Sequence, residues 1–193
     1  MFRLSEKPDT VWQIKLEPLL PAAFHRGDFM NNLLFDTNIY GLALEKKDVA
    51  DILVFFANEK QREEKEYFVL GSKIINDEIN ANPNKDARER LNELYKVVIS
   101  GEIRLTDNIK SLALEYFNEC KNKHVKITLE DCQIVASGCY ANAGFIVTNN
   151  RKTMMSPKAV EIFISITKKK GLKTPKFIGY EILKSFLPRF GVS

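Results

Sequence analysis

The sequence lacks any apolar run near the ~20 residues that a membrane-spanning helix requires. It also lacks the apolar centre of a signal peptide, because charged residues and prolines are mixed through its first segment. We therefore expect a cytoplasmic protein with no membrane association. Cysteine is scarce as well. Cys120, Cys132 and Cys139 form no metal-binding motif, and their odd number argues against a disulfide framework, so we interpret all three as small core residues.

Internal repeats and low-complexity segments are also absent. What is present is a chain of 193 residues, 45% hydrophobic and 28% charged, which is ordinary for one globular domain with a real core. The first 29 residues hold three of the seven prolines and show no strong helical period, although residues 11–18 alternate like an edge strand. We expect residues 1–30 to be an N-terminal extension, or sequence ahead of a start at Met30, and residues 31–193 to form the folded domain.

Short apolar runs alternate with longer helical patterns after residue 31. The pattern predicts strands at 33–36, 67–70, 103–105, 145–148 and 176–178. It predicts helices at about 47–65, 72–80, 86–100, 107–122, 129–142, 157–170 and 180–187. Consecutive apolar residues in the strands indicate burial on both faces, and strands separated by helices indicate βαβ units. We expect an α/β fold, a three-layer α/β/α sandwich around a central, mostly parallel five-stranded sheet.

Positive charge is concentrated in the last third of the chain. Residues 121–193 contain 13 Lys and Arg against 4 Asp and Glu, a balance of +9, whereas residues 1–120 contain 16 against 21, a balance of −5. A one-sided positive field suits a phosphate backbone. A solvated basic face is the alternative that charge alone leaves open.

The first predicted strand ends in the polar sequence Asp36-Thr37-Asn38. In an open parallel sheet, ligands bind outside the carboxyl ends of the strands, which makes Asp36 a candidate ligand. An Asp that follows a strand also commonly caps the next helix. By itself, Asp36 is compatible with both roles.

Helical periodicity places a second acid inward. At ~100° per residue, Glu78 falls between Ile74 and Ile75 on the face that should point into the protein, while Asp77 falls to the side and is expected on the surface. A carboxylate on a buried face is costly unless a positive group pairs with it. Glu78 is therefore a stronger candidate than Asp36 considered alone, with a helix end that turns toward solvent as the alternative.

A third acid, Asp131, opens a predicted helix that is apolar nearly all round and should be buried. Asp131 also stands three residues after Thr128, a capping-box-like pattern that gives it a structural alternative. The next strand ends in Thr148-Asn149-Asn150, at the same edge of the sheet as Asp36. These residues suit a turn and also suit a ligand site.

Three carboxylates in one pocket require a cation. Two carboxylates ~4 Å apart repel by roughly 4 kcal/mol at an effective dielectric of ~20, and no Lys or Arg is placed to neutralise all three. Hard oxygen ligands with open positions suit Mg²⁺ or Mn²⁺. Such ions activate a water in phosphodiester hydrolysis.

The ordered set of motifs resembles a PIN domain, with the closest likeness to the VapC-type ribonuclease toxins of toxin–antitoxin pairs. The set comprises the strand-end Asp-Thr-Asn, the helical Glu78, "LEDCQIVASGCYANAGFIVTNN" and "TPKFIGYEIL", and spans about residues 32–188. The resemblance implies a Mg²⁺- or Mn²⁺-dependent endoribonuclease in the cytoplasm. In such an enzyme the metal ligands would be Asp36, Glu78 and Asp131, the site-shaping residues Asn38 and Thr148, and the fourth catalytic residue Asn150. In the basic last third of the chain, we expect Arg151 and Lys152, just past the fourth strand, to bind the RNA backbone.

The resemblance also implies partners: a structured RNA such as tRNA or rRNA, a small antitoxin protein, and a second copy in a homodimer. Two features depart from the family pattern. The fourth position often carries Asp where this chain has Asn150, and the chain is longer than the compact toxins. The alternatives are a PIN-like protein of RNA processing and a non-catalytic RNA-binding module. An aspartyl phosphatase ranks last, because such enzymes place a second Asp where Asn38 stands.

Overall fold

The computed structural model describes residues 32–65 and 67–186. The expected N-terminal extension, residues 1–30, and its alternating stretch lie outside these ranges. The elements in chain order are β1 (Asn32–Phe35), α2 (Thr37–Glu45), α3 (Lys47–Gln61), β2 (Phe68–Ser72), α4 (Lys73–Asn80), α5 (Lys85–Val98), β3 (Gly101–Ile103), α6 (Asp107–Asn122), α7 (Leu129–Tyr140), β4 (Phe145–Val147), α8 (Pro157–Lys169), β5 (Lys176–Ile178) and α9 (Tyr180–Phe186). Within the described residues, no helix is both long and apolar enough to cross a membrane.

The five strands form one sheet in the order β3-β2-β1-β4-β5. Every pairing is parallel, so the sheet is more regular than the mostly parallel sheet that the sequence predicts. The central strand β1 has Leu34 paired with Leu70 on one side and Ile146 on the other. Because all strands point the same way, their carboxyl ends form one edge, at which Asp36 follows β1 directly.

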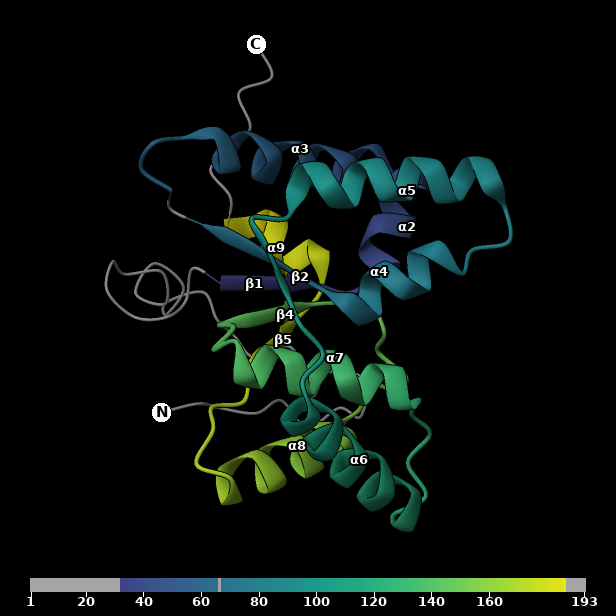
Figure 1. The fold of residues 1–193 in the computed structure, drawn as a ribbon, viewed down its shortest axis with the longest axis vertical. Coiled ribbons are helices and arrows are strands. Elements are labelled where there is room, and N and C mark those ends of the chain that lie inside the picture. Colours follow the sequence, from purple (N-terminus) through teal and green to yellow (C-terminus); the bar gives the residue numbers. More distant parts are fainter. Residues whose placement is uncertain (1–31, 66, 187–193) are drawn as a thin grey trace.

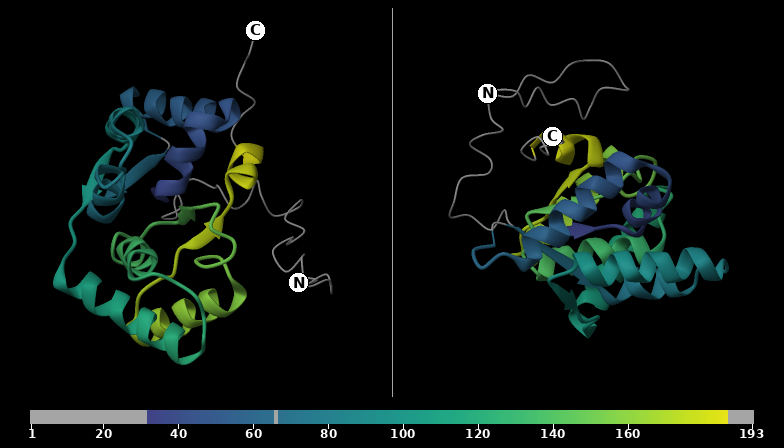
Figure 2. Two further views of the ribbon diagram at one scale, coloured as in Figure 1. Left: turned by 90° about the vertical axis from the view of Figure 1, so that its right-hand side faces the viewer. Right: turned by 90° about the horizontal axis from the view of Figure 1, so that it is seen from above.

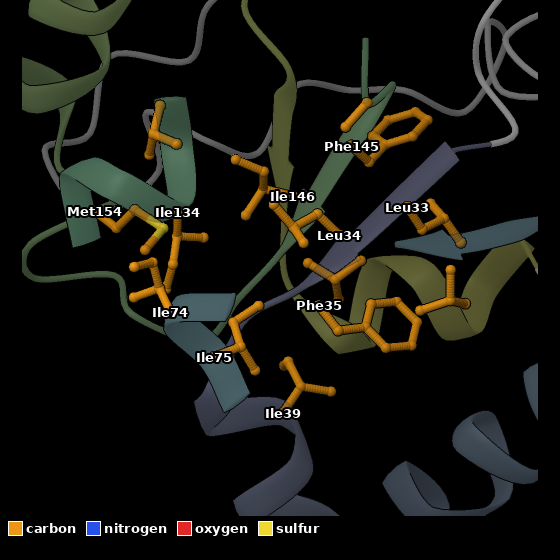
Figure 3. Packing of buried hydrophobic residues seen from close by; sticks show 14 of the residues in the cluster. Leu33, Leu34, Phe35, Ile39, Ile74, Ile75, Ile134, Phe145, Ile146 and Met154 are labelled. Carbon is orange, nitrogen blue, oxygen red and sulfur yellow. The ribbon is translucent and has the colours of Figure 1, made fainter. Parts of the chain in front are cut away.

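Helices cover both faces of the sheet, which gives the expected three layers. Helices α3 and α5 lie on one side, and α7 lies on the other with α6 and α8 beyond it (Figures 1 and 2). The apolar run of β1 is fully buried between these layers, as its consecutive hydrophobic residues indicated. Close to the carboxyl edge, Ile74 and Ile75 of α4 approach Ile134 of α7 and Ile39 of α2 respectively (Figure 3).

One helix was absent from the sequence-based prediction. Helix α2 begins at Thr37 and ends at Glu45, a segment for which the sequence pattern predicted no element. Its formation depends on tertiary packing, because Ile39, Tyr40 and Ala43 bury one face of the helix against the core. Asp36 therefore stands at the junction of a strand and a helix.

The prediction for the third strand was wrong in its position by two residues. β3 begins at Gly101 and ends at Ile103, because its register is set by pairing with Leu70 and Ser72 of the neighbouring strand. The prediction ended this strand at Leu105 because that residue is apolar. The observed strand is a short edge strand, and such strands are common at the edges of sheets. The cysteines agree with their prediction, since all three are buried and free.

The side chain of Tyr95 connects α5 to the carboxyl ends of two strands. Its hydroxyl lies 3.1 Å from the carbonyl oxygen of Ser72 and 2.9 Å from Oε1 of Glu102. Its ring packs edge-on against Tyr40 with centroids 5.6 Å apart. A Cβ at Gly71 would lie 2.4 Å from the Tyr95 hydroxyl oxygen, so this close approach requires glycine. Tyr95 thereby fixes the place where α4 leaves the sheet.

Replacement of this glycine gives a test of the packing. We expect Gly71→Ala to lower the free energy of unfolding by about 1–3 kcal/mol, because Tyr95 is buried and cannot retreat. Gly41→Ala is the matched control: no atom lies within 4 Å of a Cβ there, and the helical position should gain about 0.5–1 kcal/mol. Denaturant titration measures both. A Gly71→Ala protein as stable as the parent would contradict the packing.

Candidate active site

Asp36 lies buried at the carboxyl edge of the sheet, with 4% of its surface exposed. Its backbone N–H donates to the carbonyl of Val147 at 2.9 Å, which fixes the end of β1 against β4. Asp36 occupies the N-cap position of α2, but its carboxylate makes no capping hydrogen bond. The sequence left two roles open for Asp36, helix cap and ligand, and its carboxylate does not act as the cap. The carboxylate is instead directed at side chains from α2 and from the end of β4.

Thr148 and Asn38 hold the Asp36 carboxylate from two elements. The Thr148 hydroxyl donates to Oδ2 of Asp36 at 2.6 Å, and the amide of Asn38 donates to the same oxygen. Asn38 also donates to Thr148 Oγ1 at 3.1 Å and accepts from the Asn149 backbone N–H at 3.1 Å. The two residues expected to shape the site thus connect the first turn of α2 to the end of β4.

Glu78 lies on α4, half-buried, one turn beyond the buried Ile74 and Ile75. Its Oε2 accepts a hydrogen bond from the Thr37 hydroxyl, which joins α4 to the start of α2. Asp77 is exposed and paired with Lys73 at 2.8 Å. The helical-wheel prediction separated these adjacent acids correctly.

Asp131 fills the capping role that the sequence left open, and its carboxylate also contacts residues that follow β4. It completes a capping box at the start of α7: its N–H donates to the Thr128 hydroxyl at 3.0 Å, and its Oδ2 lies 3.5 Å from the Thr128 nitrogen. Its carboxylate also accepts from the Thr153 hydroxyl at 3.1 Å, and the Asn150 amide lies 3.4 Å from Oδ1. The cap fixes the carboxylate at the edge of the site.

Asn150 makes contacts in both directions. Its Oδ1 accepts from the backbone N–H of Thr153 at 3.3 Å, while its own N–H donates to the Thr148 hydroxyl oxygen at 3.0 Å. The side-chain NH₂ faces Asp131. Asn150 therefore presents a donor to the acids, where an Asp would present another negative charge.

The electrostatic state of Asp36 reflects its neighbours. Burial raises its pKa from 3.8 to about 7, the hydrogen bond from Thr148 opposes this rise, and repulsion from Asp131 and Glu78 adds to it. Burial also raises the pKa of Glu78, against the opposing hydrogen bond from Thr37, and repulsion from Asp131 raises it further. The three carboxyl groups thus lie close enough to repel one another.

The pKa of Asp131 is raised as well. Burial is the largest cause, and hydrogen bonds from Thr153 and Thr128 oppose the rise. Across residues 32–65 and 67–186, none of the three carboxylates forms an ion pair with Lys or Arg. Neutral hydroxyl and amide donors oppose their repulsion.

The donor set fits a hard divalent cation. Three carboxylates of raised pKa, with no positive partner in the described residues, offer only oxygen ligands and gain from a bound positive charge. The described part of the chain does not hold three or more His, Cys, Asp and Glu side chains already gathered as metal ligands. The three acids therefore suit Mg²⁺ or Mn²⁺ because they offer oxygen ligands, although they do not form a preformed metal site.

Two contacts at the site were not predicted. Thr37 donates to Glu78, and Thr153 donates to Asp131. Because Thr148 donates to Asp36, each of the three acids accepts a hydrogen bond from one threonine hydroxyl. Thr37 lies inside the Asp-Thr-Asn motif, which could have singled it out. Thr153 lies in a turn after β4 and has no comparable signal, because its contact with α7 is purely tertiary.

Comparison with known proteins shows a likeness of fold. The sequence matches no protein-family model and no curated protein. Among solved structures, the chain is similar to one chain of VapBC2 from Rickettsia felis bound to a DNA fragment from their promoter, with a TM-score of 0.50 and 16% identity over 77% of this chain and 98% of that chain. It is also similar to VapBC-1 from nontypeable Haemophilus influenzae, with a TM-score of 0.49 and 18% identity over 78% and 98% of the two chains.

The similarity to VapBC2 covers nearly all of that chain and confirms the fold that the ordered motifs predicted. At 16% identity it is a likeness of fold alone.

The raised pKa of Asp36 predicts a pH-dependent stability in the absence of metal. A carboxyl group protonated more readily when folded stabilises the protein below its unfolded pKa of about 4, and loses that contribution as the pH rises to about 7. In EDTA, the advantage of Asp36→Asn over the parent in free energy of unfolding should grow by up to about 4 kcal/mol across this range. Denaturant titrations at several pH values measure it. Asp77→Asn should give no such trend, and a pH-independent advantage of Asp36→Asn would contradict the assignment.

Proposed function

We propose that this protein is a Mg²⁺- or Mn²⁺-dependent endoribonuclease that hydrolyses RNA phosphodiester bonds. The single observation that supports it is the convergence of Asp36, Glu78 and Asp131, from three different elements, with no neutralising cation among the described residues. A folded protein keeps buried, mutually repelling carboxylates at a cost in stability, which a bound divalent ion offsets.

In this proposal Asp36, Glu78 and Asp131 hold the ion, and each is oriented by one threonine hydroxyl. The bound ion would supply an activated water and stabilise charge on the phosphate. Asn38 and Thr148 keep the most buried ligand, Asp36, in one orientation. Asn150 completes the catalytic set as a neutral donor to Asp131.

The biological setting that we propose is a toxin–antitoxin pair. VapBC2, whose fold this chain shares, was solved bound to a DNA fragment from their promoter. By analogy, this chain would be the RNA-cleaving member, inhibited by a small protein partner, acting in the cytoplasm on structured RNA such as tRNA or rRNA, and assembling as a homodimer. An RNA-processing enzyme with the same chemistry is the alternative. A non-catalytic RNA-binding module is the other alternative, and the absence of a fourth carboxylate at Asn150 favours it.

The acids are tested by conservative replacement. Asp36→Asn, Glu78→Gln and Asp131→Asn should each reduce RNA cleavage in Mn²⁺ by roughly a hundredfold or more, because each removes a charged ligand. Asp77→Asn is the matched control, since it changes the neighbouring acid of α4 on the exposed face and should retain activity. Gel-based cleavage of total RNA under single-turnover conditions measures the effect. Full activity in the Asp36→Asn protein would refute the nuclease.

Metal binding has a readout that does not depend on cleavage. Addition of Mn²⁺ at pH 8 should raise the thermal midpoint of the parent protein and leave that of Asp36→Asn nearly unchanged.

Asn150→Asp should lower stability in EDTA, because it replaces the donor to Asp131 with a fourth negative charge, and should tighten Mn²⁺ binding. Calorimetric titration measures the affinities. Equal affinities of Asn150→Asp and the parent would contradict the placement of Asn150 beside the metal ligands.

A further inference from the structure

A second feature of the carboxyl edge is an open hollow beside the acids. It has a volume of about 470 Å³ and is lined by Asn149, Asn150, Arg151, Lys152 and Glu181. The hollow adjoins the acidic site, because Asn150 lines it while its amide faces Asp131. Its lining carries two cationic side chains, two amides and a single acid. That composition suits a phosphate and the polar edge of a nucleotide.

The single acid of the hollow is paired with one of its cations. Glu181 Oε1 lies 3.5 Å from Nη2 of Arg151, and both side chains are substantially exposed, at 48% and 69%. A Cβ at position 179 would lie 2.7 Å from Oε2 of Glu181, so Gly179 leaves the space in which the carboxylate lies toward Arg151. An exposed pair of this kind contributes about 0–1 kcal/mol and is readily exchanged.

Helix α9, which carries Glu181, is anchored by contacts with neighbouring elements. Helix α9 begins at the buried Tyr180, whose hydroxyl lies 3.2 Å from the amine of Lys46 at the junction of α2 and α3. Further along α9, Lys184 pairs with Asp48 of α3 at 3.2 Å. Glu181 is therefore presented from a helix anchored to Lys46 and to α3, whereas Arg151 follows β4.

We propose that this hollow binds a phosphate of the RNA next to the bond that is cleaved, and that Glu181 occupies the Arg151 guanidinium until the phosphate displaces it. The proposal rests on the nuclease function above, which it extends to a subsite. A phosphate offers Arg151 two oxygen acceptors and a fuller charge than a solvent-exposed carboxylate. Glu181 would then lower RNA affinity twice, by competing for Arg151 and by repelling the phosphate.

The test measures binding without cleavage. A fluorescently labelled short single-stranded RNA is titrated with protein in EDTA, and binding is followed by anisotropy. We expect Glu181→Gln to bind about threefold to tenfold more tightly at low salt. Glu115→Gln is the matched control, because it also removes one acid from an exposed ion pair, here with Lys170. This pair is distant from the hollow, because Lys170 follows the end of α8, where the chain returns to the start of β5. The effect of Glu115→Gln should be below about twofold.

A double-mutant cycle separates the pair from a general change in charge. In an Arg151→Gln background, the gain from Glu181→Gln should be clearly smaller than in the parent, because the competition for Arg151 is gone and only the repulsion of the phosphate remains. An equal gain in that background, an equal gain from Glu115→Gln, or no gain from Glu181→Gln would each overturn the proposal. Cleavage by the parent in Mn²⁺ is scored separately. Absence of cleavage with the cycle intact would refute the nuclease and leave the hollow as an RNA-binding site only, whereas cleavage without the expected cycle would refute the role of the hollow and leave the nuclease standing.

Discussion

The burial of Asp36 near two other acids is the constraint on which the rest of the site depends. Asp36 is almost fully buried, burial raises its pKa, and repulsion from Asp131 and Glu78 adds to the rise. No cation from the described residues relieves this repulsion, so the surrounding fold must hold the acids together against it. The fold does so with backbone pairing at the end of β1, with the capping box of α7, and with one threonine hydroxyl for each acid.

Helix placement reduces the cost of this arrangement. Asp36 precedes the first turn of α2 and Asp131 lies in the first turn of α7, so both carboxylates are near the positive ends of helix dipoles. Such an end stabilises an adjacent negative charge by about 0.3–1 kcal/mol, too little to cancel the burial of a carboxylate. In the function proposed above, a divalent ion offsets the remainder, so the stability of the apo protein and its affinity for metal should change in opposite directions when charge is added at this edge.

The sequence was informative where a residue's role follows from local periodicity. The wheel around Ile74 separated Glu78 from Asp77, and the capping pattern located Asp131, because both depend on neighbours within one helical turn. It was uninformative where long-range packing decides. Helix α2 forms because tertiary contacts bury one of its faces, and the hydroxyl of Thr153 reaches Asp131 only after β4 and α7 are brought side by side. Sheet order is likewise set by packing of the whole domain.

Asn150 shows how one neutral residue can adjust the site. An amide at this position accepts from the backbone of the turn through Oδ1 and directs its NH₂ at Asp131, so both of its polar ends are satisfied. An Asp here would keep the first contact and replace the second with repulsion, since it has no proton to donate when ionised. The chain thus holds three acidic charges at the edge instead of four. The expected consequence is a more stable apo protein with weaker metal binding, and a smaller field opposing an RNA phosphate as it enters the hollow beside Arg151.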